Sequence, residues 1–262
     1  MRSNTRKQLL ISLAIDAGIG LFLHFFSMWW AVSIDPIERP IVSEYNFTIW
    51  YENKADIIDW RVLQVICHAL ILALTFLTCR LKYAQHFLLI SATTLGTYIH
   101  GNGVYIILLS VLKTFAGRLR PDFVDRCQPD AKGVCTGDPD VVREGRVSWP
   151  SGHSGLTGFA TVFALFLLND LLKPFSAESF RSLRMLPLVV VGLLGILSGL
   201  SRNIDNHHHV GDIVCGLVLG GIVAVWAWYL RQKYNNNIVN KKEDQVALLH
   251  GTPKTPRTNE LV

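Results

Sequence analysis

Six long apolar runs constrain the fold of this chain more than any other feature of its sequence. A helix needs roughly 20 mostly apolar residues to cross a bilayer. The runs cover Leu9–Val32, Val62–Cys79, Phe87–Leu112, Gly155–Leu172, Met185–Leu200 and Val210–Leu230. The fifth run is short, and its helix could begin earlier, within residues 181–186. The sequence therefore predicts an all-α integral membrane protein in which six transmembrane helices form one bundle.

Composition supports a membrane protein. Charged residues make up 17% of the chain, whereas a soluble domain carries about 25%. Basic loops account for much of the net charge of +5, so this charge gives little reason to expect a nucleic-acid partner. We expect residues 1–8 to be a cytoplasmic N-terminus, residues 9–234 to form the membrane domain, and the polar residues 235–262 to be a disordered cytoplasmic tail. The first run is too long for a typical cleaved signal peptide and is interpreted as a signal anchor.

Lysine and arginine residues in the short loops indicate the orientation. With six spans, the basic N-terminus, the second-to-third and fourth-to-fifth connections and the basic tail lie on one side, which is predicted to be cytoplasmic. Residues 33–61, 113–154 and 201–209 then lie on the lumenal or extracellular side. Residues 113–154 are also basic, so their charges are expected to have another role. The sequence does not choose between an endomembrane (ER, Golgi or vacuole) and the plasma membrane.

Two features of the outer side fit a lumenal or extracellular location. Asn46 begins the triplet NFT, a candidate glycosylation site. Cys127 and Cys135 lie in one outer loop, where they form either a disulfide or two free thiols. Small residues also recur four apart in Gly195–Gly199 and Gly216–Gly220, a spacing that indicates helix packing within one bundle more often than dimerisation. The sequence does not fix the oligomeric state.

Polar residues gather at the predicted outer ends of the spans. Lys113 ends the third span and Arg120 follows it, in KTFAGRLRP. The segment WPSGHSG opens the fourth span, and SRNIDNHHHVGD joins the fifth to the sixth. Polar groups at a membrane boundary are costly and usually functional. Because all three segments lie at the same membrane edge, we expect them to meet in one pocket.

The first two segments suit an anion. Lys113 and Arg120 can hold phosphate oxygens, although taken alone such residues more often extend toward lipid headgroups. In PSGH, Ser151 and Gly152 stand where a helix begins, so free backbone N–H groups offer an anion site. Helix capping by itself would account for Ser151. Capping does not account for His153, which is placed to exchange a proton beside the anion.

The third segment offers a nucleophile. Asp212 follows His208 by four residues and His209 by three, so either imidazole can share a helix face with its carboxylate. A carboxylate that accepts from one ring nitrogen leaves the other nitrogen free to attack. Only one nucleophile is needed, so His207 and His209 are interpreted as spare histidines of a solvated loop. Arg202 adds another cation to the pocket.

A metal ion is disfavoured among so many cations, although histidine and aspartate are common ligands. Phosphoryl transfer depends mainly on positioning and charge stabilisation. A cationic pocket with one histidine nucleophile and one histidine acid therefore suits cleavage of a phosphate ester without metal or other cofactor.

Three motifs in order carry a family resemblance. KTFAGRLRP fits K-x6-RP, PSGH stands intact, and SRNIDNHHHVGD fits SR-x5-H-x3-D. Together they resemble the type 2 phosphatidic acid phosphatase superfamily, the lipid phosphate phosphatases. The motifs span Lys113–Asp212, and the six-span layout extends the likeness to about Leu9–Leu230. The flanking GRLRPDFVDRC is similar to fungal diacylglycerol pyrophosphate and lipid phosphate phosphatases.

The resemblance implies a role for each motif residue. His208 would attack phosphorus and form a phosphohistidine, Asp212 would orient His208, and His153 would protonate the leaving oxygen. The phosphate oxygens would be held by Lys113, Arg120, Ser151, Gly152 and Arg202. The resemblance also implies independence from magnesium, a site facing the lumen or exterior, and membrane phospholipid phosphates as substrates: diacylglycerol pyrophosphate, phosphatidate or lysophosphatidate.

Other functions remain open at this point. The same pocket could act on a prenyl (dolichyl) pyrophosphate, a sphingoid phosphate or a sugar phosphate. A lipid carrier without catalysis is the alternative from a different class, although an inactive relative would be expected to lack a catalytic residue. Related haloperoxidases bind vanadate in this pocket and include soluble proteins, so six spans argue against that role.

Overall fold

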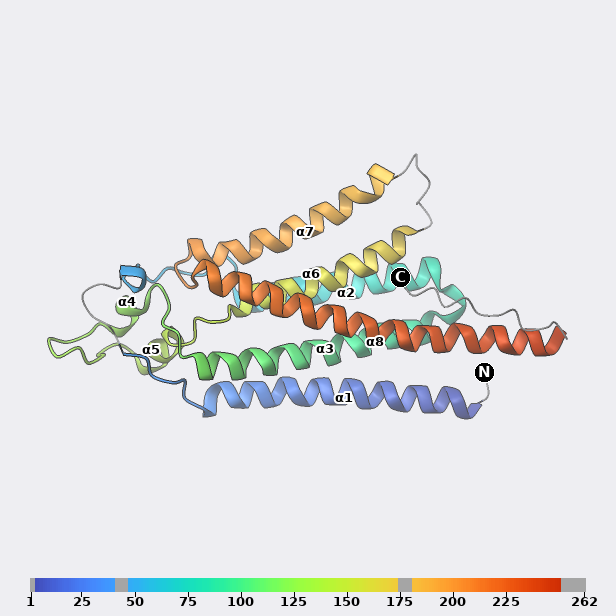
Figure 1. Cartoon of the computed structure of the whole chain (residues 1–262), viewed down its shortest axis with the longest axis horizontal. Helices are drawn as coiled ribbons and strands as arrows, with labels where there is room; N and C mark the ends of the chain where they lie inside the picture. Colours follow the sequence, from blue (N-terminus) through green and yellow to red (C-terminus); the bar gives the residue numbers. More distant parts are fainter. Residues whose placement is uncertain (1–2, 41–46, 174–180, 251–262) are drawn as a thin grey trace.

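The computed structural model describes residues 3–40, 47–173 and 181–250, and these residues form a bundle of long helices (Figure 1). The long helices are α1 (Ser3–Ser33), α2 (Trp60–Lys82), α3 (Phe87–Ala116), α6 (Gly152–Leu172), α7 (Arg181–Ile204) and α8 (Val210–His250). The connections contain the short helices η1 (Phe47–Ile49), η2 (Ala84–His86), α4 (Phe123–Cys127) and α5 (Pro139–Gly145). The described residues form no β-strand beyond one isolated bridge, between Pro129 and Cys135.

The six predicted spans are confirmed. Six helical stretches are long and apolar enough to cross a membrane: Lys7–Ser33, Trp60–Lys82, Ala84–Ala116, Gly152–Leu172, Met185–Ile204 and Val210–Asn236. The fifth helix begins at Arg181, the early end of the range that the sequence allowed. The chain is therefore an all-α, multi-pass membrane protein.

The predicted disordered tail is wrong for residues 235–250, because α8 continues as one helix to His250. The segment KKEDQVALL consists largely of residues with good helix propensity. It also extends an existing helix, so it avoids the cost of nucleation. Residues 251–262 lie outside the described part of the chain.

Helix α6 occupies the centre of the bundle. It packs against α8, α7 and α2, whereas α1 lies along α3 at the periphery (Figure 1). The core beside α6 is aromatic: Phe159 stacks on Tyr105 with ring centroids 6.1 Å apart, and Phe163 meets Tyr98 at 5.3 Å. Buried aromatic pairs of this kind add to the stability that their area provides.

Glycines bring α6 and α8 into backbone contact. A Cβ atom on Gly220 would collide with the carbonyl oxygen of Gly155, and one on Gly216 would lie 2.5 Å from the carbonyl oxygen of Ser151. Gly216 and Gly220 thus serve packing within one bundle, as their spacing predicts. The close approach brings the start of α6 beside the start of α8.

The connection between α3 and α6 folds into a small unit of its own. Phe123 and Val142 pack there with Leu119 and Ile49 in a separate apolar cluster. A disulfide joins Cys127 to Cys135, which decides between the two readings that the sequence left open. The candidate glycosylation residue Asn46 lies outside the described residues.

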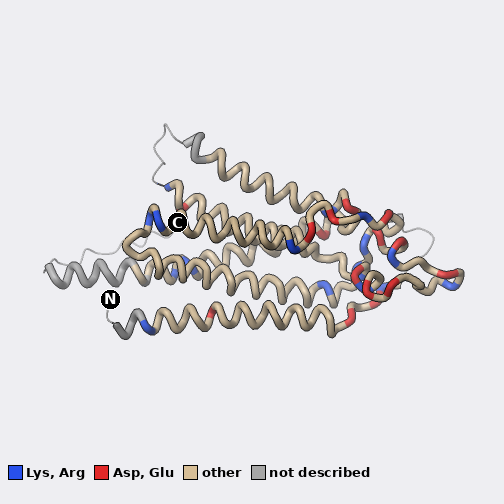
Figure 2. The backbone as a smooth tube through the Cα atoms, turned by 180° about the vertical axis from the view of Figure 1, so that it is seen from behind, with Lys and Arg blue, Asp and Glu red and all other residues tan. Residues whose placement is uncertain are grey.

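The two ends of the bundle differ in charge. The end with α4, α5 and the long connections carries most of the described acidic and basic residues, and the described N-terminus and the far end of α8 lie opposite (Figure 1 and Figure 2). At that opposite end, the Asp170 carboxylate accepts from the Tyr83 hydroxyl at 3.1 Å and lies 3.3 Å from Arg231 Nη2. Lys82 also pairs with Asp170. This cluster ties α2, α6 and α8 together.

Replacing Arg231 with methionine should destabilise the bundle. The change leaves the buried Asp170 carboxylate with fewer partners, and breaking a buried ion pair typically costs about 3–5 kcal/mol. Thermal unfolding in detergent should show a clearly lower midpoint for Arg231→Met. The exposed Lys233 of the same helix provides the control, and equal midpoints for Arg231→Met and Lys233→Met would contradict a stabilising role for the cluster.

Candidate active site

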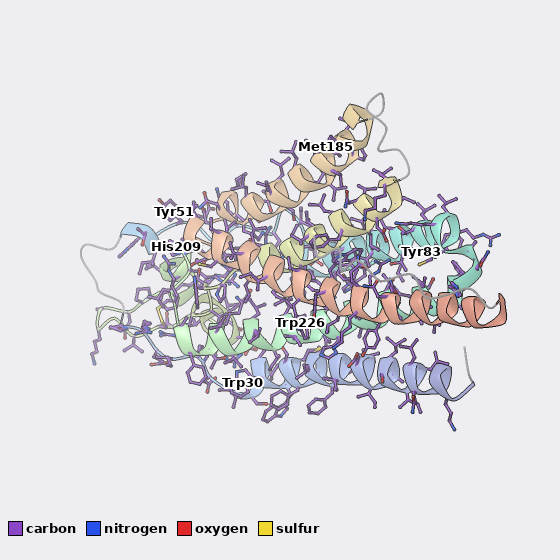
Figure 3. All side chains as sticks on the ribbon, turned by 45° about the vertical axis from the view of Figure 1, so that its right-hand side comes forward. Trp30, Tyr51, Tyr83, Met185, His209 and Trp226 are labelled. Carbon is purple, nitrogen blue, oxygen red and sulfur yellow. A yellow bond between two sulfur atoms is a disulfide. The ribbon has the colours of Figure 1, made fainter. Side chains whose placement is uncertain are left out.

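The three polar segments meet at the charged end of the bundle. The Ser151 N–H donates to the Asp212 carbonyl oxygen at 3.0 Å, which joins the start of α6 to the start of α8. The Ser148 N–H donates to the Arg118 carbonyl oxygen at 2.9 Å. This bond brings the two ends of the α3–α6 connection together beside the site. Figure 3 shows His209 at this end and Tyr83 at the opposite end of the bundle.

The end of α3 supplies the first two cations. Gly117 ends the helix in the left-handed region, with φ of 54°, and a side chain there would collide with Ile37. In the last turn, Lys113 Nζ donates to the Val147 carbonyl oxygen at 2.5 Å. Beyond the turn, the buried Arg120 pairs through Nη2 with the Glu144 carboxylate at 3.1 Å.

The start of α6 is built as a capped helix terminus. Ser151 is the N-cap, and its hydroxyl accepts from the Ser154 N–H at 3.4 Å. The Tyr105 hydroxyl donates to the Gly152 carbonyl oxygen at 2.9 Å, which fixes the first turn against α3. His153 follows, with Nε2 3.4 Å from Arg202 Nη1. The sequence predicts both the cap and the neighbouring histidine at this helix start.

His208 is buried with one ring nitrogen engaged. Its side chain is 3% exposed, and Nδ1 lies 3.5 Å from the Ser148 hydroxyl. The His208 backbone N–H donates to the Arg202 carbonyl oxygen at 3.2 Å, which holds the turn between α7 and α8. Because Nδ1 faces Ser148, Nε2 is the nitrogen left for a reacting group.

Asp212 contacts His209 directly and His208 only through Ser148. Asp212 Oδ2 lies 3.1 Å from His209 Nδ1 and 4.0 Å from His208 Nδ1. The Ser148 hydroxyl donates to Oδ2 at 2.6 Å, and Arg118 Nη1 donates to Oδ1 at 2.6 Å. The serine hydroxyl therefore bridges the carboxylate and the imidazole that the sequence expects to touch.

The interpretation of His207 as a spare histidine in a solvated loop is wrong. Its side chain is buried, with Nδ1 2.8 Å from Asp56 Oδ1 and Nε2 3.5 Å from Asp122 Oδ2. His209 is also partly buried, against Asp212. The reason is that the connection between α1 and α2 covers this turn, which spacing along the chain does not indicate.

Arg202 lies between two carboxylates. Its Nη1 donates to Asp56 Oδ1 at 2.8 Å, and its Nη2 pairs with Asp205. Asp56, Asp205 and His207 bring potential metal-ligand atoms within 4.8 Å of one another. The Arg202 guanidinium already pairs with both carboxylates, so this group fits a held arginine better than a divalent cation.

Sequence reasoning missed Ser148, Glu144 and Asp56, and it gave no role to Arg118, which stands inside KTFAGRLRP. A lone serine, glutamate or aspartate in an outer loop carries no spacing signal. Arg118, Glu144 and Ser148 belong to the predicted basic connection, residues 113–154, and the excess charge of that connection was the one available hint. That charge is balanced locally by Glu144, which lies against Arg120 and Arg126.

Burial and charge set the protonation of the site. Burial is the main cause that lowers the pKa of His208 well below its ordinary 6.5, and Arg120, Lys113 and His153 add to the shift. A hydrogen bond to the Ser148 backbone acts in the opposite direction. Burial also lowers the pKa of His207. Both imidazoles are therefore neutral near pH 7.

The arrangement suits an anion. Within the described part of the chain, three arginines carry a buried Nε–H without a hydrogen-bond partner: Arg120, Arg126 and Arg202. Arg120 and Arg202 are the two that the motifs predict for the pocket. A carboxylate holds the outer nitrogens of each guanidinium. Arginine is well suited to phosphate oxygens, and a helix terminus beside the two arginines adds further donors.

Comparison with known proteins gives the family. Residues 86–236, more than half of the chain, match the model of the PAP2 superfamily. Phospholipid phosphatase 1 of Rattus norvegicus is 32% identical over 183 residues, which cover 64% of this chain and 64% of the relative. Lipid phosphate phosphatase 2 of Arabidopsis thaliana is 33% identical over 134 residues, covering 47% and 45%.

A PA-phosphatase related-family protein of Dictyostelium discoideum is 34% identical over 127 residues, which cover 48% of this chain and 44% of the relative. The chain thus spans about half to two thirds of the length of these relatives. No solved structure matches it. The particular likeness to fungal enzymes stays a prediction. The matched region contains all three motifs and the site that they form, and the chain belongs to the PAP2 superfamily.

Proposed function

We propose that this protein is a magnesium-independent lipid phosphate phosphatase that works through a phosphohistidine on His208. One observation carries the proposal: His208 and His153 share a largely buried site with Lys113, Arg120 and Arg202. Such a site provides a nucleophile, a proton donor and charge stabilisation for a phosphate ester without a metal.

In the first half of the reaction, His208 Nε2 attacks phosphorus and the bond from phosphorus to the ester oxygen breaks. The leaving oxygen takes a proton from the His153 imidazolium and departs as an alcohol or, from a pyrophosphate, as a phosphate. Asp212 and Ser148 hold His208 with Nδ1 turned away from the substrate. They also stabilise the positive charge that develops on the ring.

In the second half, water attacks phosphorus as the phosphorus–nitrogen bond breaks. Neutral His153 takes the proton from water, so inorganic phosphate leaves and both histidines return to their starting forms. Five residues are proposed to bind the phosphate oxygens throughout: Lys113, Arg120, Ser151, Gly152 and Arg202. Preorganised donors of this kind contribute most where charge develops in the transition state.

Several observations support a lipid substrate. The site lies where six apolar helices end, so a phosphate at headgroup level would reach it. A cavity of about 350 Å³ opens beside Lys113 and Glu144, bordered by Ala31 and Ile34 near the end of α1. It offers room for the part of a lipid next to its phosphate. Relatives are named phospholipid and lipid phosphate phosphatases.

We propose that the site faces a lumen or the exterior and that both termini are cytoplasmic. The basic loops favour this orientation. The disulfide between Cys127 and Cys135 supports it, because disulfides persist on the oxidising side of a membrane. Which membrane holds the protein is left to experiment.

The central test is phosphate release by purified protein in mixed micelles with excess EDTA. Diacylglycerol pyrophosphate, phosphatidate, lysophosphatidate, sphingosine 1-phosphate and a prenyl pyrophosphate would be compared. We expect release from at least the glycerolipids. His208→Ala should lower kcat by a factor of about 10⁵ or more, as loss of a catalytic nucleophile does.

The matched control is His86→Ala, at the opposite end of the bundle, which should keep full activity. Loss of activity in His209→Ala but not in His208→Ala would show that His209, and not His208, is the nucleophile. No release from any lipid by folded protein would reject the phosphatase and favour a lipid carrier.

The pH profile of kcat/KM should show a group that titrates below pH 6.5. A lowered pKa means that His208 stays neutral, and able to attack, as the pH falls through 6.5. The substrate phosphate itself titrates near pH 6. The test therefore compares the pH profile of the wild-type protein with that of a variant on the same substrate. Arg120→Gln removes a neighbouring positive charge and should move the acidic limb to higher pH. An unmoved limb would contradict the electrostatic account.

Ser148→Ala should lower kcat by about 10- to 100-fold with little change in KM. The change removes a hydrogen bond to a charged group, which is worth about 1.5–3 kcal/mol, and it disconnects Asp212 from His208. Steady-state kinetics on phosphatidate measure the effect. The buried Ser27, which pairs with Ser110 between α1 and α3, supplies the control variant Ser27→Ala. Equal activities would remove Ser148 from the proposed machinery.

A further inference from the structure

A segment of the α1–α2 connection crosses the site and lies outside the region that matches the family. Residues 51–57 form this strap, and four hydrogen bonds attach it to the two motif-bearing loops. The bonds join Tyr51 N–H to Pro121 O at 2.9 Å, Asn53 N–H to Asp125 Oδ2 at 2.8 Å, Asn206 Nδ2 to Glu52 O at 3.0 Å and Ile57 N–H to Asp205 Oδ2 at 3.2 Å. Bonds on both sides fix the strap in place.

The strap carries Asp56 into the site. One carboxylate oxygen accepts from Arg202 Nη1 at 2.8 Å and lies 2.8 Å from His207 Nδ1. The other lies 3.9 Å from His153 Nε2. Burial alone would raise the pKa of Asp56, but the hydrogen bond and charge of Arg202 outweigh it. The carboxylate is therefore ionised at neutral pH.

Asp56 helps to fix the orientation of a phosphate-binding arginine. Asp56 holds Arg202 Nη1 while Asp205 holds Nη2, so the guanidinium plane is defined from two sides. The Nε–H stays buried and, among the described residues, unpartnered. A donor held in this way loses little freedom when a phosphate oxygen arrives.

Asp56 also changes the balance of charge around the proposed proton donor. Arg202 Nη1 lies 3.4 Å from His153 Nε2, and Asp56 Oδ2 lies 3.9 Å from the same nitrogen. The guanidinium opposes a positive charge on the imidazole, and the carboxylate favours one. Asp56 is therefore placed to stabilise the imidazolium form of His153 that would serve the leaving oxygen.

We propose that Asp56 is a positioning residue of the phosphatase site, which orients Arg202 toward phosphate and keeps His153 ready to protonate the leaving oxygen. The inference rests on the proposed function. The opposite reading makes Asp56 an internal competitor that the substrate phosphate must displace. The carboxylate engages Arg202 and His207 at 2.8 Å each, and four hydrogen bonds hold the backbone segment that carries it. The structure therefore favours a carboxylate that stays.

A comparison of two substrates separates a loss of proton donation by His153 from a general loss of activity. Phosphatidate loses a strongly basic alkoxide and needs the acid, whereas 4-nitrophenyl phosphate loses a weak base and needs it far less. Asp56→Asn should lower kcat/KM about 10²-fold for phosphatidate but no more than about 10-fold for 4-nitrophenyl phosphate. His153→Asn should show the same asymmetry, and Asp56→Glu should keep the wild-type ratio.

Asp59→Asn is the matched control. Asp59 lies three residues further on, is exposed, and caps α2, a role that asparagine also fills. Thermal unfolding checks that each variant is folded. An equal loss on both substrates would overturn the role toward His153, and a gain in activity would identify a competitor. A wild-type protein that releases no phosphate would instead reject the proposed function.

Discussion

The site depends first on the contact between the backbones of α6 and α8. Helices with ordinary side chains pack 8–10 Å apart, and here glycines remove those side chains where the two helices begin. The approach lets the Ser151 N–H reach the Asp212 carbonyl oxygen directly. A bulkier residue at Gly216 or Gly220 would separate the histidine of one helix start from the histidine of the other without touching either motif.

Charge is the second constraint on the site. Buried cations are tolerated when carboxylates hold them, and here each arginine of the pocket has such a partner. Glu144 serves Arg120, and Asp56 with Asp205 serves Arg202. The carboxylates engage terminal nitrogens and leave the Nε–H groups without partners among the described residues. The pocket is thus stable while empty and still has donors for an anion.

Much of the fold and of the candidate site was predictable from the sequence, because both depend on the periodicity of apolar residues and on residue type. Apolar runs revealed the six helices, and the spacing of lysine, arginine, serine and histidine indicated a shared anion pocket. The positions of Ser148 and Asp56 in the site, the burial of His207 and the length of α8 were not predictable. The first three depend on how the loops pack against one another, and the last depends on a helix that continues past its apolar stretch. Neither property produces a periodic pattern in the sequence.

The strap has a consequence for how the protein matures. The hydrogen bond between Arg202 and Asp56 joins residues 146 positions apart, one in the last turn of α7 and one in the connection between α1 and α2. Contacts of such long range form late, because loop closure must precede them. The pocket is therefore complete only after the last two helices, α7 and α8, have packed against the helices inserted before them. A chain halted before α7 is inserted would lack Arg202 and the histidines that follow it, so the site is complete only when the whole bundle has assembled.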